Sequence, residues 1–428
     1  MTTRGSLPPT PPGVPVVGHA PAFARDPFGF VRRSVNGTGD VFRMRLFGRD
    51  VHVVAHPTHV RTILRRPDAF RKPDDFRVAF GEAVLSVHGE QWRRQREAMG
   101  DIFGPNRITA HADRMAEVAA ERIADWSGDT VRLDTAMRGV ALDNPFEVVL
   151  GASLDPAEID ELAEAAASLN LYFKPTTWAL PDWVPTPARR DFRRGKATVR
   201  NQARRLLDGA DVDGDGLIPA LATLESAPDS EFDREEVLDQ VVGMLFAGHE
   251  TTALAMTYGL HQIAAHDDVT ERFDDELDGI EAGTAGVEGT PYLDRVVNET
   301  LRLYPPVHAL PRITDERVEI GEYVIPAGEQ LLVSIWNLHH DPRFYDDPWA
   351  FDPDRWLGAS PEEYGHAFIP FGAGPRVCLG RHFSRTEMKA VFTAVGRRYR
   401  IDAEGSPAID PQMTSQPAAP VTVSLQRR

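Results

Sequence analysis

The sequence contains a single cysteine, Cys378, in the segment Phe371-Gly-Ala-Gly-Pro-Arg-Val-Cys-Leu-Gly380. A lone thiol can form neither an intrachain disulfide nor a site with several cysteine ligands. It is therefore a buried structural residue, a nucleophile or a single thiolate ligand to a metal. The metal ligand is favoured because Gly374 permits a turn closed to other residues, and Gly380 lets the backbone approach a flat ligand. Arg376 can donate a charge-assisted hydrogen bond to an acidic edge of that ligand.

A helix is predicted over residues 381–398, directly after the cysteine segment. The N-terminus of a helix stabilises negative charge, so it would help the thiol of Cys378 to stay ionised. Backbone N–H groups of the intervening turn can also donate hydrogen bonds to the sulfur and tune a bound metal.

A second group of residues pairs an acid with arginines. Glu299 and Arg302 are three residues apart on a predicted helix and share one face. Such a pair is usually a surface feature worth little stability. Here the segment 351–356, which contains Arg355, can bring a second arginine to the same carboxylate. A buried network of this kind would fix the irregular segment 341–376 that leads into the cysteine segment.

A third group lies in the long helix predicted over residues 233–264. Its apolar stripe is interrupted by Gly248-His-Glu250-Thr251-Thr252. A polar patch inside a core helix is costly unless it is hydrogen-bonded or functional. Hydrogen bonds from Thr hydroxyls to the preceding helical turn can bend the helix and open a groove there. Glu250 and Thr251 could then deliver protons to a bound oxygen species.

The fold class predicted from these patterns is mainly α with small β-sheets (α+β), in one large domain over residues 1–428. A proline-rich N-terminal lead-in covers residues 1–40, a hairpin is expected over 41–54, and residues 67–87 are irregular. Strands are also expected between 317 and 335. The predicted helices, besides the two given above, span residues 57–65, 89–100, 106–126, 155–173, 186–208, 217–225, 267–280 and 291–303.

The composition limits the classes of partner. The net charge of −17 argues against general nucleic-acid binding, which requires a basic face. Nearly all basic residues are arginine, and a salt-adapted surface and GC-rich coding explain this equally well. No apolar run approaches a membrane span or a secretory signal, so we expect a soluble, cytoplasmic protein.

Four motifs occur together here in the order found in a known family: the interrupted helix, the Glu299–Arg302 pair, the segment 351–356 and the cysteine segment. In this respect the chain resembles the cytochrome P450 family of haem-thiolate monooxygenases, in its soluble prokaryotic form. The resemblance extends over nearly the whole chain. It implies haem b as cofactor, with Cys378 as axial iron ligand, and Glu250 and Thr251 as the acid–alcohol pair of oxygen activation. Glu299, Arg302 and Arg355 would form the structural triad of the family. Further cofactor-binding residues implied by the resemblance are His88, Trp92, Arg96, Arg312, Phe371, Arg376 and Gly380.

The resemblance also implies the partners. No flavin- or nicotinamide-binding domain is recognisable, so electrons would come from a separate ferredoxin or flavodoxin. Its docking site would be a basic patch of Arg93, Arg94, Arg381 and Arg385. We expect a monomer.

The substrate should be apolar, such as a lipid, fatty acid, carotenoid or terpenoid, and residues 169–183 would form a mobile lid. The residues expected to line the pocket are Phe76, Val78, Phe80, Val84, Leu85, Phe246, Ala247, Val307, Ala309 and Leu310. Two alternatives remain at this point: a peroxide-using peroxygenase of the same fold, and a non-catalytic haem sensor or electron carrier. The Glu250–Thr251 pair counts against both.

Overall fold

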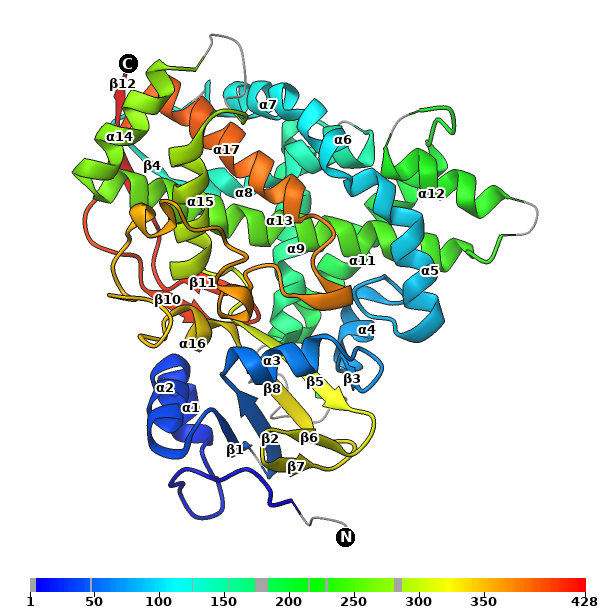
Figure 1. The fold of residues 1–428 in the computed structure, drawn as a ribbon. Coiled ribbons are helices and arrows are strands. Elements are labelled where there is room, and N and C mark those ends of the chain that lie inside the picture. The colour runs from blue at the N-terminus through cyan, green and yellow to red at the C-terminus, as the bar shows by residue number, and fades with distance from the viewer. Residues whose placement is uncertain are drawn as a thin grey trace. The chain divides into compact units, whose positions relative to one another are not determined.

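The computed structural model describes residues 5–46, 48–124, 126–152, 154–173, 184–214, 216–227, 230–280 and 287–428. The chain forms two compact units (Figure 1). The first, here called the sheet unit, comprises residues 1–74, 307–351 and 358–378. The second, the helical unit, comprises residues 75–306, 352–357 and 379–428.

The sheet unit is built on a five-stranded sheet of order β1-β2-β8-β5-β3. β2 and β8 are parallel and the other neighbours antiparallel. The strands of this sheet are β1 (Val41–Leu46), β2 (Arg49–Val54), β3 (Phe70–Arg71), β5 (Ala309–Thr314) and β8 (Gln330–Ser334). The other elements of the unit are α1 (Ala20–Arg25), α2 (Pro27–Thr38), α3 (Pro57–Leu64), β6 (Val318–Ile320), β7 (Tyr323–Ile325), α16 (Ile335–His339), and the 3-10 turns η5 (Gly365–Ala367) and η6 (Gly374–Arg376).

The core of the sheet unit explains why these segments become strands. Val41, Val54 and Val333 are β-branched and buried, and they pack with Ile63 of α3. Ile369, in the irregular segment before the cysteine, joins the same core. This contact fixes the start of the cysteine segment on the sheet unit.

The helical unit is organised around α13 (Arg234–Ala265), whose position among the other helices is seen in Figure 1. Asp233 caps α13 by accepting a hydrogen bond from the Glu236 N–H. α8 packs against α13, and α17 packs against both α7 and α13. The other helices of the unit are α4 (Asp75–Phe80), α5 (Gly89–Gly100), α6 (Pro105–Ala110), α7 (Ala112–Ala124), α8 (Leu133–Asn144), α9 (Pro156–Ser168), α11 (Pro187–Asp208), α12 (Leu217–Ser226), α14 (Asp267–Asp278), α15 (Pro291–Leu303) and α17 (Arg381–Arg398).

Short segments complete this unit. The strands β4 (Thr130–Arg132), β12 (Thr422–Arg427) and β9 (Tyr399–Asp402) form one small sheet, and β10 (Ile409–Pro411) and β11 (Ser415–Pro417) pair separately. The remaining elements are the 3-10 segments η1 (Asp101–Phe103), η3 (Leu169–Phe173) and η4 (Pro353–Trp356), and the π-helical η2 (Pro145–Leu150).

The mainly helical fold class and most of the helix bounds are as predicted, with the following differences. Residues 106–126 were expected to form one helix, but α6 ends at Ala110 and α7 begins at Ala112. The helix expected to reach residue 173 changes at Leu169 to the 3-10 segment η3. α8 was not predicted, because Gly139 and Leu142 are buried on the side opposite its main apolar stripe and blur the helical period. α4 and β3 lie within the segment expected to be irregular, and α1 and α2 within the lead-in.

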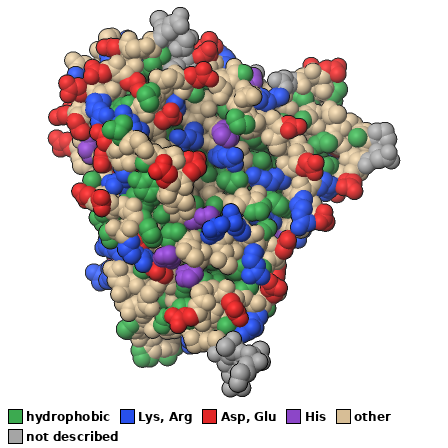
Figure 2. Space-filling model, viewed as in Figure 1, with side chains coloured by type: hydrophobic (Ala, Val, Ile, Leu, Met, Phe, Trp, Pro, Cys, Tyr) green, Lys and Arg blue, Asp and Glu red, His purple; other side chains and the backbone are tan. Residues whose placement is uncertain are grey.

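Among the described helices, none is both long and apolar enough to span a membrane. On the face drawn in Figure 2, acidic side chains are spread over the surface with basic side chains between them. This mixture agrees with the acidic composition.

Candidate functional site

The cysteine segment is a tight loop of the sheet unit. The Cys378 N–H donates to the Phe371 carbonyl at 3.0 Å and closes the loop, and the Cys378 side chain is exposed. Gly374 has φ +72°, and a Cβ at this position would lie 2.3 Å from the carbonyl oxygen of Leu64. The prediction that Gly374 occupies a turn closed to other residues is therefore confirmed.

Gly380 lies outside this loop, directly before α17. The nearest described heavy atom to a Cβ at position 380 would be Phe103 Cε1, at the ordinary contact distance of 4.0 Å. No described protein atom therefore demands glycine at position 380. α17 begins at Arg381, three residues after Cys378, as predicted.

Two guanidinium groups of the sheet unit lie close enough to repel each other. Arg312 is buried on β5, and its Nη1 donates to the Pro311 carbonyl at 2.8 Å. Burial, with a further contribution from the positive charge of Arg376, lowers the pKa of Arg312 to about 10. No carboxylate appears among the groups that set this pKa. Two such cations fit an anionic ligand group, and the propionates of a haem have that chemistry.

In the helical unit, His88 lies just before α5 and has an extended backbone. Trp92 is buried on α5, and the Arg96 guanidinium carbon lies 5.9 Å from the centroid of its ring. Positions 92 and 96 therefore share one face of α5, whereas His88 precedes the helix. This pair presents one stacked cation that can bind a carboxylate.

The predicted acid–arginine network is present in the helical unit. Glu299 and Arg302 are fully buried on α15, and Arg302 binds the carboxylate in bidentate fashion at 2.9 and 2.7 Å. Arg355 Nε donates to the same carboxylate at 3.4 Å. The sequence did not indicate that Trp356 Nε1 also donates to it, at 3.0 Å, and the Asp352 N–H at 3.1 Å. Satisfying a buried carboxylate in this way offsets its desolvation and fixes η4 against α15.

One stripe of α13 remains accessible although the helix is otherwise largely buried. Met244, Ala247, Gly248 and Thr251 are the accessible residues between Glu236 and Ala264, at the spacing of one helical face. Thr251 Oγ1 donates to the Ala247 carbonyl at 2.8 Å, which is the back-bonding expected from the sequence. The stripe has mostly small side chains and one hydroxyl group, so it can accept a flat ligand or a small polar molecule.

Glu250 lies on a different face of α13. Its side chain is buried, Asn170 Nδ2 donates to Oε2, and Gln416 Nε2 donates to Oε1 at 2.6 Å. Burial raises the pKa of Glu250, whereas the Asn170 bond, the positive charge of Arg138 and the Gln416 bond lower it. No hydrogen bond joins Glu250 to Thr251 among the described residues. The sequence placed these two residues side by side, but it did not reveal the amide partners.

His249, between Gly248 and Glu250, is buried with neither ring nitrogen hydrogen-bonded among the described residues. Burial lowers the pKa of His249 to about 3, so its imidazole is neutral at physiological pH. It therefore adds no charge beside Glu250.

Several of the predicted pocket residues form an aromatic cluster in the helical unit. Phe80 lies 4.5 Å from Phe246 and 6.2 Å from Phe173, and Phe76 lies 5.5 Å from Phe173, measured between ring centroids. Leu85 packs against this cluster. The sequence did not single out Phe173, although it lies inside the predicted lid. Of that lid, residues 169–173 form η3, and 174–183 lie outside the described residues.

The other predicted pocket residues are more scattered. Val84 packs against the main core of the helical unit, and Val78 is 45% exposed. Val307, Ala309 and Leu310 are half-buried in the sheet unit, where Leu310 contacts its core. The structure thus joins Phe76, Phe80, Leu85 and Phe246, but it does not gather Val78 or Val84 with them.

The predicted basic patch is largely compensated within the helical unit. Arg93 pairs with Glu90, Arg94 with Glu236, and Arg385 approaches Asp294 at 3.9 Å. Its net charge is therefore smaller than the number of arginines indicated.

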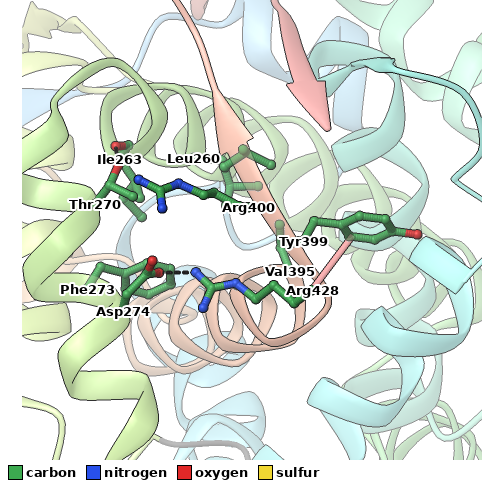
Figure 3. Close-up of a pocket in the computed structure, with 11 residues that line it drawn as sticks. Leu260, Ile263, Thr270, Phe273, Asp274, Val395, Tyr399, Arg400 and Arg428 are labelled. Carbon is green, nitrogen blue, oxygen red and sulfur yellow. Dashed lines mark hydrogen bonds and ion pairs between the residues drawn. The ribbon is translucent and has the colours of Figure 1, made fainter. Parts of the chain in front are cut away.

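A small pocket lies near the C-terminal end of α13, among α14, α17 and β9 (Figure 3). Its wall includes Leu260, Phe273 and Tyr399, and Arg428 pairs with Asp274 at its edge. It contains none of the predicted site residues.

Comparisons with known proteins agree with this geometry. A family model described as Cytochrome P450 matches residues 8–425. Cyclooctat-9-en-7-ol 5-monooxygenase of Streptomyces melanosporofaciens is 32% identical, over 92% of this chain and 89% of the relative. Pentalenene oxygenase of Streptomyces avermitilis is 27% identical, over 98% and 95%. The solved structure of retinoic acid bound cyanobacterial CYP120A1 superposes with a TM-score of 0.86 at 24% identity, and covers 99% of this chain and 100% of that one.

Proposed function

The chain belongs to the cytochrome P450 family and is a haem-dependent monooxygenase, and we propose that it hydroxylates an apolar terpenoid- or lipid-like substrate. The observation that carries this proposal is the accessible stripe of α13, which presents the Thr251 hydroxyl from an otherwise buried helix. An electron carrier or haem sensor has no need of such a hydroxyl beside a buried acid.

The cofactor is proposed to be haem b, held through Cys378 and the basic groups. The glycine turn leaves the Cys378 side chain exposed, and the mutual repulsion of Arg312 and Arg376 favours an anionic partner. Arg312, Arg376 and Arg96 are the proposed propionate ligands, and the other proposed haem-binding residues are His88, Trp92, Phe371 and Gly380. When bound, the haem supplies the redox chemistry that activates dioxygen, and a thiolate ligand favours O–O cleavage.

Glu250 and Thr251 are proposed to supply protons. Thr251 Oγ1 lies on the accessible stripe and can present a proton there, while the Ala247 carbonyl accepts its resting hydrogen bond. Glu250 is the acid that reloads it, after a side-chain rotation from its buried face. Glu299, Arg302 and Arg355 have the structural task of fixing the chain before the cysteine segment.

The substrate class rests on the aromatic cluster and on the relatives. Phe76, Phe80, Phe173 and Phe246 belong to one hydrophobic cluster and offer an apolar wall. Two relatives are named for terpenoid substrates, cyclooctat-9-en-7-ol and pentalenene. A terpenoid is therefore favoured over a fatty acid. Leu85, Ala247, Val307, Ala309 and Leu310 are the further proposed lining residues.

Electrons are proposed to come from a separate ferredoxin or flavodoxin. Arg381, at the start of α17, has no acidic partner among the described residues, unlike Arg93, Arg94 and Arg385. Arg381→Glu should therefore slow reduction by an acidic ferredoxin more than Arg93→Glu, and equal rates for both variants would exclude this docking surface.

The reduced carbon monoxide complex tests the proposal as a whole. A thiolate-ligated iron gives a red-shifted absorption band, which Cys378→Ser should abolish. Absence of that band from the wild-type protein would contradict the assignment of Cys378. Thr251→Ala should divert oxygen from product to hydrogen peroxide, and unchanged product per oxygen would exclude the relay. Spectral shifts on adding terpenoids, fatty acids and steroids would then identify the substrate class.

A further inference from the structure

The two side-chain amides that bind Glu250 carry an inference about how its acid is controlled. Glu250 Oε2 accepts from Asn170 on η3, and Oε1 accepts from Gln416 on β11. All three side chains are buried. The partners come from segments 80 and 166 residues away in the sequence, so neither contact follows from local helix geometry.

We propose that Asn170 and Gln416 are positioning residues that hold the Glu250 carboxylate on the buried face of α13, one residue before Thr251, in a form that can still gain and lose a proton. This inference rests on the proposed role of Glu250 as the proton donor to Thr251. Neither amide contacts the reacting atoms. Both act through the orientation and acidity of Glu250.

The helical unit contains a second buried glutamate, Glu299, which is held by guanidinium groups and not by amides, and the two sites can be compared. Glu299 is held by the guanidinium groups of Arg302 and Arg355, which bring two permanent positive charges to a buried carboxylate. Such an acid is suited to structure and unsuited to proton transfer. Amides donate hydrogen bonds to a carboxylate without adding a full charge, so Glu250 can cycle between its ionised and neutral forms.

The charged and titratable groups near Glu250 are consistent with this contrast between an amide-bound and a guanidinium-bound carboxylate. Arg138, from α8, lowers the pKa of Glu250, and its Nη2 donates to Gln416 Oε1 at 3.4 Å. Gln416 therefore separates the guanidinium from the carboxylate, and its Nε2 also bonds Thr414 Oγ1. His249, on α13 itself, is neutral. The Asn170 Oδ1 atom is buried without a hydrogen-bond partner among the described residues. After an amide flip it can accept from Glu250 in the protonated form.

Asn170 also lies three residues before Phe173 on the same 3-10 segment. Phe173 packs on Phe80 of the proposed substrate wall. A substrate that moves this wall therefore moves the residue that orients the acid.

The experiment exchanges acid and amide between positions 170 and 250. Asn170→Asp removes the donor and sets two carboxyl groups against each other, and Glu250→Gln removes the acid. The double variant N170D/E250Q restores a carboxylate–amide hydrogen bond with the acid moved to position 170. We measure urea unfolding of each holoprotein and, separately, product formed per oxygen consumed.

The double variant should recover stability in urea unfolding but should not recover product formed per oxygen consumed. Both single variants should lower the urea midpoint, and the double variant should recover most of it. Product per oxygen should fall about tenfold or more in N170D, in E250Q and in the double variant, because general acid catalysis typically contributes ~100-fold or more. An acid at position 170 cannot replace the proton donor at position 250. Asn170→Leu, which adds no charge, should move the pH profile of coupling up by ~1–2 units, since one hydrogen bond to a carboxylate is lost. Because Asn170→Leu adds no charge, it also tests the proposal if N170D does not fold.

The matched control is the other buried amide–carboxyl pair of the unit, in which Asn144 Nδ2 donates to Glu387 at 3.1 Å. N144D/E387Q should leave product per oxygen unchanged. Recovery of coupling in N170D/E250Q, or wild-type coupling and pH profile in both N170L and Gln416→Leu, would overturn the proposal. A wild-type protein without the thiolate carbon monoxide band would instead refute the proposed function, while the unfolding measurements would still report on the two amides.

Discussion

Glu387 should make the stability of this protein depend strongly on pH. Its side chain is fully buried on α17, where Oε1 accepts from Asn144 Nδ2 at 3.1 Å. Oε2 is buried without a hydrogen-bond partner among the described residues. Burial raises the pKa of Glu387 to about 8, and the nearby Asp143 carboxyl contributes in the same direction, while the Asn144 hydrogen bond opposes it.

The direction of this pH dependence follows from the protonation of Glu387 in the folded and in the unfolded chain. An exposed Glu titrates near pH ~4.3, so between that pH and about 8 the unfolded chain ionises Glu387 while the folded protein keeps it protonated. Stability from this residue is therefore fully present below pH ~4 and is lost as the pH rises to about 8. Each pH unit costs ~1.4 kcal/mol, which gives a loss of roughly 1 kcal/mol at pH 5, 3 at pH 7 and 5 above pH 8.

Glu387→Gln removes this titration with little change of shape. The new amide can also donate to Asn144 Oδ1, which is buried without a partner among the described residues. Urea unfolding at pH 5, 7 and 8.5 should show the variant gaining over the wild type by ~1, ~3 and ~5 kcal/mol. Glu271→Gln, at an exposed position of α14, is the control and should change stability by less than ~0.5 kcal/mol at each pH. A difference between Glu387→Gln and wild type that does not vary with pH would refute the reasoning.

Three further substitutions test the site. Arg302→Met should lower the free energy of unfolding by ~3–5 kcal/mol in urea titrations, because it leaves the Glu299 carboxylate buried without its main partner; a loss under ~1 kcal/mol would contradict this. Gly374→Ala should greatly reduce the thiolate carbon monoxide band, since its Cβ meets the Leu64 carbonyl oxygen at 2.3 Å, and an unchanged band would mean that the loop adapts. Phe80→Ala should lower the free energy of unfolding by ~3–5 kcal/mol, and bulkier terpenoids than with the wild type should then produce the spectral shift of substrate binding. The same ligand preference as the wild type would show that Phe80 is not part of the substrate wall.

The parts of the site that the sequence revealed are those set by local geometry. Glu299 and Arg302 are three residues apart on one helix, so their contact required only the correct helix. Thr251 reaches the Ala247 carbonyl by the same reasoning. The turn at Gly374 followed from the residue type, and its positive φ agrees.

What the sequence did not reveal depends on contacts made by folding. Gln416 is 166 residues from Glu250, and a glutamine in a short strand carries no signal of its own. α8 was missed although Met137 and Val140 are buried at helical spacing, because Gly139 and Leu142 are also buried on the other side and blur the helical period. Arg94 and Arg385 read as part of a basic patch because their acidic partners, Glu236 and Asp294, lie on other helices. The partner of Arg93 is Glu90, one turn earlier on the same helix, and this local pair could have been recognised.

The order Glu250-Thr251 on α13 has a physical reason. Adjacent residues of a helix point about 100° apart, so an acid one residue before the hydroxyl cannot share its accessible stripe. The hydroxyl thus meets the ligand side, where Ala247 and Gly248 leave room, and the acid is kept in a buried polar environment. That separation keeps the acid from forming a permanent hydrogen bond with the hydroxyl that we propose it protonates, and Asn170 and Gln416 are left to orient Glu250. A helix that placed both side chains on one face would join donor and acceptor directly and lose this control.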